Sequence, residues 1–420
     1  MKKETKRDEE LGKALPFDFE TYRQQVVQGL MQGQPLTGDQ GLLKPLIAQF
    51  VEAALDAEMS DHLQEEREEG LSNRRNGSKT KTVKTSVGPV EVQYDRDRRG
   101  SFDPVTVKKR QNKLGVGFDD QILELYAMSN SVADISTHLQ RMYGVEMSQS
   151  RISAVISSTW EVVKTWQERP LPALYVVLFI DAVNFKIRRD GAVQNTALYV
   201  MYGITVEGQR EIVALLPGQS VESASEWGRC LEDLKRRGLQ DVLIICSDGL
   251  SGLKPVMEQA FKQAKVQRCV VHKIRNCFKL IDNKDSKQVL QQLKGVYMAV
   301  NEPAAKRALE DFGEHWKGKY KVIVQMWEKD WEELMVCMQF GPTLRKITYT
   351  TNAVENLNRE IRRVTKTKGA WASDRALLIQ LYHALERNKK SWSKKVHNWA
   401  SVQRELTEIF GQRFTNHLKG

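Results

Sequence analysis

The stretch LYVVLFIDAVNFKIRRDGAVQNTALYVMYGITV, residues 174–206, decides the fold of this chain. It is rich in β-branched and aromatic side chains, which favour strands, and Asp190–Gly191 supplies a turn. Asp181 ends the most apolar run, LYVVLFID. We expect strands at 174–181, 184–189 and 195–206.

Downstream of these strands the pattern alternates between strand and helix. A short edge strand at 211–218 precedes a helical pattern at 223–238, and a second apolar run, VLIICSD, ends in Asp248. Another helix (252–264) and strand (266–272) follow. Three antiparallel strands followed by alternating helix and strand are typical of a ribonuclease-H-like α/β core. A doubly wound dinucleotide-binding fold is excluded, because the early strands lack intervening helices and a glycine-rich phosphate motif.

Two aspartates, Asp181 and Asp248, end the two most apolar strands. A carboxylate at the tip of a buried strand is held rigidly and faces the mouth of the sheet. The simpler interpretation is that each aspartate only ends a strand or caps a helix.

A glutamate, Glu355, lies in the basic helical pattern YTTNAVENLNREIRR. Asn358, Arg359 and Arg362 follow it by three, four and seven residues and therefore share its helix face. The simpler alternative is a capping box, because Asn352 precedes Glu355 by three residues. A carboxylate beside cations that bind phosphate is what a metal-and-phosphate site requires.

Three such carboxylates can converge on two divalent metal ions about 4 Å apart, which activate an attacking oxygen and stabilise a leaving one. Ligands that are all oxygen favour Mg²⁺, with Mn²⁺ as a substitute. Such a site breaks and joins phosphodiester bonds without a covalent protein–DNA intermediate. We therefore predict Asp181, Asp248 and Glu355 as catalytic, metal-binding residues.

Cys269 and His272 form a single C-x-x-H pair at the end of the strand expected at 266–272. One pair cannot complete a tetrahedral zinc site, so we expect a structural or supporting role near Asp248. The five cysteines are too few and too irregular for a disulfide framework, and they fit a reducing cytoplasm.

Residues 281–345 are mostly helical in pattern and carry Trp316, Trp327 and Trp331. The simplest interpretation is an all-helical insertion whose tryptophans form its core. The alternative is that one tryptophan stacks on an unpaired or flipped base near the cleavage site.

The chain has 64 Lys and Arg against 53 Asp and Glu, a net charge of +11. A basic surplus suggests a polyanionic partner, most often nucleic acid, although ordinary solubility charge is the alternative. No apolar run reaches the roughly 20 residues of a membrane helix. The basic N-terminus lacks the apolar segment of a signal peptide.

Three regions precede the α/β region. Residues 1–70 are helical in pattern, and residues 71–116 alternate around a Val-Gly-Pro turn, which indicates a basic β-ribbon. Residues 117–168 resemble a helix-turn-helix domain, although three-helix units are also common structural filler. Its third helix is expected over 148–166, with Gln149 and Arg151 at the start placed to read bases. The ribbon cations expected to contact phosphates are Arg74, Arg75, Lys79, Lys81, Arg98, Arg99, Lys108, Lys109 and Arg110.

Further DNA contacts are expected beside the acidic residues. These are Lys273, Arg275, Arg359, Arg362 and Arg363. The catalytic region is assigned to 172–372, with the insertion at about 281–345, and C-terminal helices are assigned to 373–420.

The motifs together resemble bacterial insertion-sequence transposases of the Mutator-like family. The resemblance rests on several segments: ALDAEMSDHL, the ribbon RRNGSKTKTVKTSVGPVEVQYDRDRRGSFDP, FIDAVNFKIR, CSDGLSGLKPV, QRCVVHKIRN and TTNAVENLNREIRRVTKTKGAW. It implies a DDE transposase with Asp181, Asp248 and Glu355 as metal ligands, and Cys269 and His272 as the family's C/D-x-x-H signature. It further implies binding to terminal inverted repeats and integration through a circular double-stranded intermediate.

Two alternatives remain open from the sequence. One is a regulator that binds repeats without cutting, and the other is a structure-specific nuclease that cuts without joining. Because both ends of an element must be held together, we expect a dimer or larger assembly on DNA. We expect neither a membrane nor a small-molecule partner.

Overall fold

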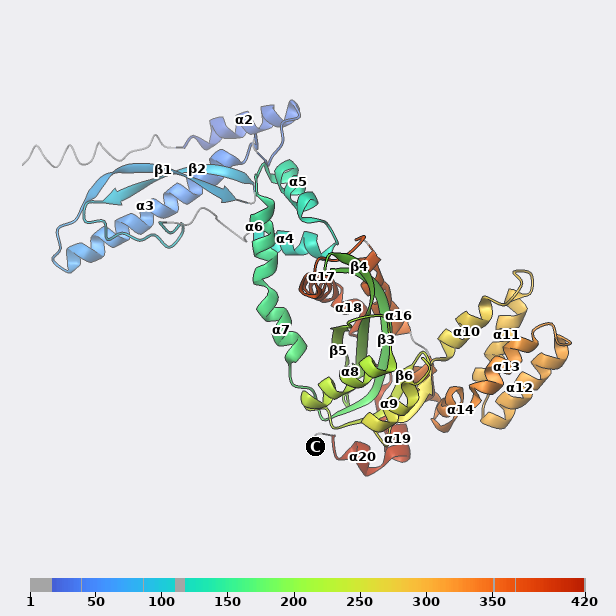
Figure 1. Ribbon diagram of the computed structural model, residues 1–420. Helices are drawn as coiled ribbons and strands as arrows, with labels where there is room; N and C mark the ends of the chain where they lie inside the picture. The colour runs from blue at the N-terminus through green and yellow to red at the C-terminus, as the bar shows by residue number, and fades with distance from the viewer. Residues whose placement is uncertain are drawn as a thin grey trace, which may run out of the picture. The chain divides into compact units, whose positions relative to one another are not determined.

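The computed structural model describes residues 17–38, 40–85, 87–109, 118–349, 352–366 and 368–418. The chain divides into two compact units, residues 1–158 and 159–420 (Figure 1). Each unit has a hydrophobic core of its own. Within the described residues, no helix has the length and apolar character needed to cross a membrane.

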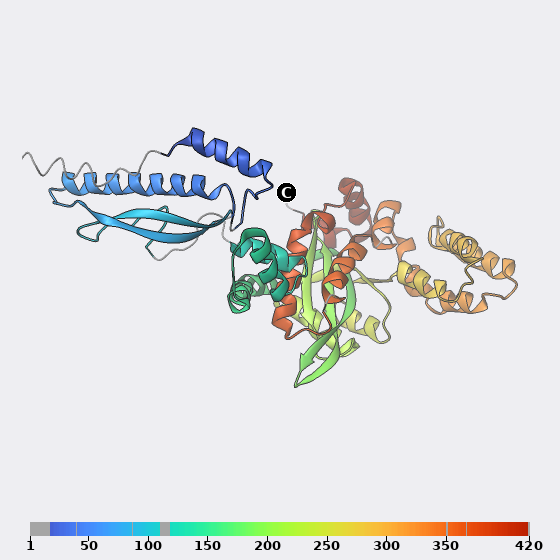
Figure 2. The same ribbon diagram turned by 90° about the horizontal axis from the view of Figure 1, so that it is seen from above.

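The first unit contains a long helix packed on a two-stranded hairpin (Figure 2). Helix α2 (Phe19–Met31) precedes α3 (Lys44–Glu68), which lies along the antiparallel strands β1 (Arg75–Thr85) and β2 (Gly88–Asp97). Because strand side chains alternate between faces, one face of the hairpin packs on α3 while the other is largely exposed. The shared core consists of Val51, Leu55, Val83, Val90, Val92 and Val107.

Three helices complete the first unit. They are α4 (Phe118–Ala127), α5 (Val132–Tyr143) and α6 (Gln149–Ser158). Ser131 and Asp134 form a capping box at the start of α5, and Gly144 ends α5 in the left-handed conformation.

The single helix expected over 148–166 is divided in two, so that expectation is wrong. Helix α6 ends at Ser158, and α7 (Trp160–Glu168) begins after Thr159. The Ser158 hydroxyl donates to the carbonyl of Val155 at 2.7 Å. Hydroxyl side chains compete in this way for backbone acceptors and weaken a helix.

A five-stranded sheet with the order β5-β4-β3-β6-β7 forms the centre of the second unit. Strands β3 (Leu174–Arg189), β4 (Ala192–Ile204) and β5 (Arg210–Pro217) are antiparallel. Strands β6 (Asp241–Ser247) and β7 (Lys265–Arg268) run parallel to β3. The two strands expected at 174–181 and 184–189 are therefore one strand, because β4 pairs with β3 without a break from Val177 to Arg189.

Helices α8 (Ala224–Arg236) and α9 (Leu253–Ala260) cover one face of this sheet (Figure 1). Their core includes Tyr199, Met201, Trp227 and Ile245. Helix α16 (Asn352–Lys366) packs against β3. The remaining C-terminal helices are α15 (Pro342–Tyr349), α17 (Asp374–Arg387), α18 (Lys389–Trp392), α19 (Trp399–Phe410) and α20 (Gln412–Thr415).

A group of helices lies between the last strand and α15, to one side of the sheet (Figures 1 and 2). It packs around its own core, which includes Leu293, Phe312 and Trp327. Its elements are α10 (Val270–Phe278), α11 (Ser286–Tyr297), α12 (Glu302–His315), α13 (Lys321–Lys329), α14 (Trp331–Leu334) and the 3₁₀ turn Val336–Gln339.

Candidate active site

Asp181 lies in the middle of β3 and not at a strand tip, which corrects the expectation. Its position is nevertheless special, because the pairing of β3 with β6 ends at Phe179 and Cys246. Asp248 follows the end of β6 directly. Extending the parallel register by two residues brings Asp248 level with Asp181, at the point where the sheet opens.

Hydrogen bonds hold the buried carboxylate of Asp181, which is 8% exposed. Asn358 on α16 donates through Nδ2 to one carboxylate oxygen at 2.5 Å, and the Ala182 amide donates to the other at 2.8 Å. Asn358 is itself buried. Helix α16 is thereby tied to β3 at the residue most central to the predicted site.

Glu355 lies one turn before Asn358, in the first turn of α16. Its carboxylate forms an ion pair with the guanidinium of Arg275 on α10. The two side chains are partly exposed, at 33% and 49%. Two residues predicted for different roles, one as a metal ligand and one as a DNA contact, are therefore bound to each other.

One pocket, called the acidic pocket below, is lined by most of the residues predicted for the active site. Its lining combines residues from the two strand ends, from α10 and from α16. They are Phe179, Ile180, Asp181, Cys246, Ser247, Asp248, Cys269, His272, Arg275, Glu355, Asn358 and Arg362. Segments separated by well over a hundred residues of sequence thus meet at one place.

The electrostatics of this acidic pocket follow from its burial. Burial raises the pKa of Asp181, and the charge of Asp248 acts in the same direction, while His272 and Arg362 oppose it. Burial also raises the pKa of Cys269 to about 11. A neutral thiol is a poor metal ligand, which fits a structural role for this cysteine.

A fourth acidic residue near the site, Glu222, was not predicted from the sequence. Trp227 Nε1 donates to its carboxylate at 2.8 Å. Burial raises the pKa of Glu222, and the charges of Asp248 and Asp181 raise it further, so Glu222 lies within their electrostatic reach. No sequence pattern indicated Glu222, because this residue lies in a polar turn and follows no apolar run.

The loop after Asp248 is packed tightly against Arg268 at the end of β7. Gly249 has a φ of +86°, and a Cβ there would lie 2.1 Å from Arg268 Nε. The same guanidinium forms an ion pair with Asp330 at 2.8 Å. A side chain at this position would strain the left-handed backbone and displace the Arg268 guanidinium, which favours glycine.

The donor atoms of the acidic pocket give partial support for the predicted metal ions. Within the described residues, no three His, Cys, Asp or Glu side chains lie close enough to hold one ion. The pocket nevertheless contains two buried polar atoms without a hydrogen-bond partner, Asn358 Oδ1 and His272 Nδ1. Unpaired buried polar atoms next to two carboxylates fit a cation or its bound water.

The residues predicted to contact DNA beside the pocket differ in exposure and in their ion pairs. Lys273 is 5% exposed and pairs with Asp330 at 2.5 Å, so it faces the protein interior and its expected DNA contact is wrong. Arg359 is exposed, and Arg363 pairs with Glu360 at 2.8 Å.

The tryptophans of the helical group serve its packing. Trp327 is completely buried, which rules it out as a stacking surface in this conformation. Trp316 and Trp331 are half-buried against the same core. Their indole N–H groups donate to Gln292 and Glu302 at 2.7 and 2.8 Å.

The ribbon cations of the first unit fall into two groups. Arg75 pairs with Asp56 and Asp95, and Lys81 donates to the carbonyl of Lys108 at 2.8 Å, so these two serve the hairpin itself. Arg110 lies outside the described residues. The exposed cations are Arg74, Lys79, Arg98, Arg99, Lys108 and Lys109.

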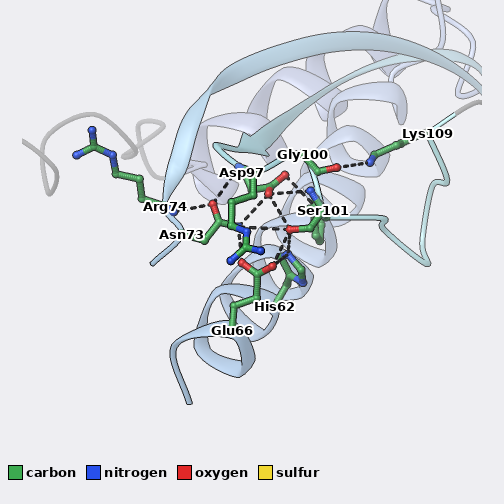
Figure 3. A network of polar contacts seen from close by, with 10 residues as sticks. His62, Glu66, Asn73, Arg74, Asp97, Gly100, Ser101 and Lys109 are labelled. Carbon is green, nitrogen blue, oxygen red and sulfur yellow. Dashed lines mark hydrogen bonds and ion pairs between the residues drawn. The ribbon is translucent and has the colours of Figure 1, made fainter. Parts of the chain in front are cut away.

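A polar network fixes the loops that carry several of these arginines (Figure 3). Asn73 Oδ1 accepts from the amides of Arg74 and Arg99, at 2.9 and 3.2 Å. Asn73 Nδ2 donates to Glu66 and Asp97 at 2.5 and 2.9 Å. The backbone on both sides of the hairpin base is thereby locked to α3.

The same network lowers the pKa of two acidic side chains, Glu66 and Asp97. The Ser101 hydroxyl donates to Glu66 at 2.7 Å and lies 3.1 Å from His62 Nε2. Burial alone raises the pKa of Asp97, but hydrogen bonds from Asn73, Ser101 and Phe102 outweigh it and lower the pKa below its usual range.

The expected base-reading residues lie at the start of α6. Gln149 is its first residue and is exposed. Arg151 is exposed and lies 3.8 Å from Asp119 on α4.

Comparisons with known proteins match most of the chain. The family model for "Transposase, Mutator family" matches residues 20–395. The chain is 39% identical to the transposase for insertion sequence element ISRM3 of Rhizobium meliloti, over 90% of this chain and 95% of that protein. It is 32% identical to the transposase for IS905 of Lactococcus lactis, over 84% and 92%. It is 30% identical to the transposase for IS256 in transposon Tn4001 of Staphylococcus aureus, over 72% and 77%.

Proposed function

The chain belongs to the Mutator family of transposases, and from this premise we propose that it binds the terminal inverted repeats of its own element and cuts and joins DNA there with a ribonuclease-H-like catalytic core. The observation that carries the proposal is the convergence of Asp181, Asp248 and Glu355 on one pocket. The sheet order β5-β4-β3-β6-β7 supports it, because three antiparallel strands followed by two parallel ones are the arrangement expected of that core.

In this proposal Asp181, Asp248 and Glu355 would hold Mg²⁺ ions, which would activate the attacking oxygen and neutralise charge on the phosphodiester. The residues of the chain position the reaction. Asn358 orients the Asp181 carboxylate, and Gly249 lets the loop carrying Asp248 pack closely on Arg268. Arg362 lines the pocket and is placed to bind a phosphate oxygen.

The pairing of Glu355 with Arg275 gives the third ligand two states. In the structure its carboxylate is neutralised by the guanidinium. A DNA phosphate offers Arg275 an alternative anion, and the exchange frees Glu355 for metal. We propose that DNA binding completes the ligand set in this way, because both side chains are exposed enough to rearrange.

The first unit is proposed to bind the repeats. Its exposed cations contact phosphates, and the network around Asn73 fixes the backbone of two of them, Arg74 and Arg99. Gln149 and Arg151 on α6 read base edges in the manner of a helix-turn-helix. Two ends must be brought together for transposition, which calls for a dimer or larger assembly on DNA.

A joining assay tests the proposal. Paired duplexes that carry the DNA flanking the reading frame are incubated with the protein and Mg²⁺, with Asp181→Asn as the inactive control. Joined products support a transposase. Nicks without joining indicate a nuclease, and binding without nicks indicates a regulator.

A further inference from the structure

We propose that a second pocket beside the acidic pocket takes the base of one unpaired nucleotide adjacent to the scissile phosphodiester. This inference rests on the proposed function and adds a binding site to it. The pocket lies between the sheet, α15 and the segment before α19. It is lined by Phe179, Tyr202, Ile204, Arg210, Thr343, Lys346, Ile347, Val396, His397 and Asn398.

The position of this base pocket follows from the strand geometry. Phe179 lines both pockets. It lies two residues before Asp181 on β3, so the two side chains point to the same face of the sheet, about 7 Å apart along the strand. A strand whose phosphate is held at the carboxylates would therefore bring its neighbouring nucleotide over Phe179.

The size and polarity of the base pocket suit a nucleobase with its phosphate. Its volume is about 200 Å³. A cavity of about 150 Å³ already accommodates benzene, so one planar base is a reasonable occupant. Phe179 pairs with Tyr202 across the strands, with ring centroids 6.2 Å apart. The two side chains are 5% and 1% exposed, so a base would touch only the small part of these rings that lines the pocket.

The permanently charged side chains that line the base pocket, Arg210 and Lys346, are both cations. Arg210, Lys346 and His397 are among the lining residues, and no carboxylate is among the described ones. A purely apolar ligand gains nothing from these cations, whereas a nucleotide presents both a flat ring and a phosphate.

The walls of the base pocket are fixed in advance. The Tyr202 hydroxyl donates to the carbonyl of Trp392 at 2.5 Å, and the Val396 amide donates to Gly208 at 2.9 Å. Glu405 accepts from the amides of Thr343 and Leu344 at 3.0 and 2.8 Å, which anchors the start of α15. A preorganised pocket costs little to fill, which favours binding.

The base-stacking role that the sequence suggested for tryptophans is thus reassigned. Trp327 is buried in the helical group. The pocket at Phe179 instead lies next to the carboxylates and combines an apolar lining with the cations Arg210 and Lys346.

The test fills the base pocket and then removes the base. Ile347→Trp places an indole in the cavity. The matched control is Val322→Trp, at an exposed position of α13. Binding and cleavage are measured on the flanking-DNA duplex, intact or with an abasic nucleotide at each position around the nick. We expect Ile347→Trp to weaken binding and cleavage of intact DNA by about five- to 150-fold, the loss of one base–aromatic stack.

An abasic nucleotide at one position next to the nick should restore Ile347→Trp to within threefold (roughly) of the wild type, because the indole replaces the missing base. Absence of rescue at every position would overturn the base pocket while leaving cleavage by the wild type intact. A wild-type protein that neither binds nor cuts the duplex would instead overturn the proposed function, and the base pocket with it. Circular dichroism confirms that both variants fold.

Discussion

Asp181 and Glu355 reach the same pocket, but the protein holds them by different means. Asp181 is buried on β3 and accepts hydrogen bonds from a neutral amide and from its neighbour's backbone. Glu355 is partly exposed on α16 and is neutralised by Arg275. The strand half of the site is therefore preformed, whereas the helix half depends on a contact that can be exchanged.

The difference has a physical basis. A buried hydrogen bond is costly to break, because the groups it leaves behind lose their partners without reaching water. An exposed ion pair contributes only about 1 kcal/mol or less, so a phosphate can replace one partner. The predictions below separate fixed contacts from exchangeable ones.

The largest effect is expected from the carboxylates themselves. Asp181→Asn, Asp248→Asn or Glu355→Gln should each lower cleavage by more than about a thousandfold, because each removes a ligand charge while preserving shape. Binding of repeat DNA, measured by fluorescence anisotropy, should change little. Asp190→Asn in the exposed β3–β4 turn is the isosteric control. Full cleavage by any one of the three variants would remove that residue from the site.

A smaller effect is expected at Asn358, which fixes the preformed half. Asn358→Ala should lower cleavage by about 10- to 100-fold, the usual cost of removing a group that orients a metal ligand. Asn356→Ala on the same helix is the matched control, since its amide oxygen only accepts from Arg359. Equal losses from both variants would show that helix stability, and not the orientation of Asp181, is responsible.

Sequence pattern located the preformed half of the site but misjudged its geometry. The apolar runs correctly identified the strand that carries Asp181 and the strand that Asp248 follows, and the structure pairs these two strands with each other. They could not show that β3 continues past Asp181, because that continuation depends on pairing with β4, including Asn184 with Ala197.

The exchangeable half was less accessible to the sequence. Arg275 and Glu355 are separated by 80 residues, so no local spacing predicts their contact. Lys273 and Arg275 are both basic and two positions apart, yet on helix α10 they point in different directions, one to buried Asp330 and one to the pocket. Without a helix assigned over 270–278, the two were indistinguishable.

The preceding variants should lose activity, whereas a variant of the contact between Arg275 and Glu355 should gain affinity for metal. Arg275→Gln should tighten Mn²⁺ binding in the absence of DNA by at most about fivefold, because Glu355 loses a competing cation. The same variant should bind DNA more weakly. Isothermal titration measures both, with Lys279→Gln at the C-cap of the same helix as the charge-matched control. Weaker Mn²⁺ binding by Arg275→Gln would contradict the exchange.

The smallest effects should appear in the hairpin, where two arginines repeat the contrast between fixed and exchangeable contacts. Arg98 is exposed, so Arg98→Gln should weaken DNA binding and lower by about one unit the slope of log affinity against log salt concentration.

Arg75 is held by Asp56 and Asp95, so Arg75→Gln should lower the free energy of unfolding by about 1 kcal/mol. Its salt slope should stay unchanged, because an arginine that already neutralises two carboxylates releases no counterion from DNA. Salt titrations and urea unfolding distinguish the two, and a lower slope for Arg75→Gln would place that side chain on the DNA.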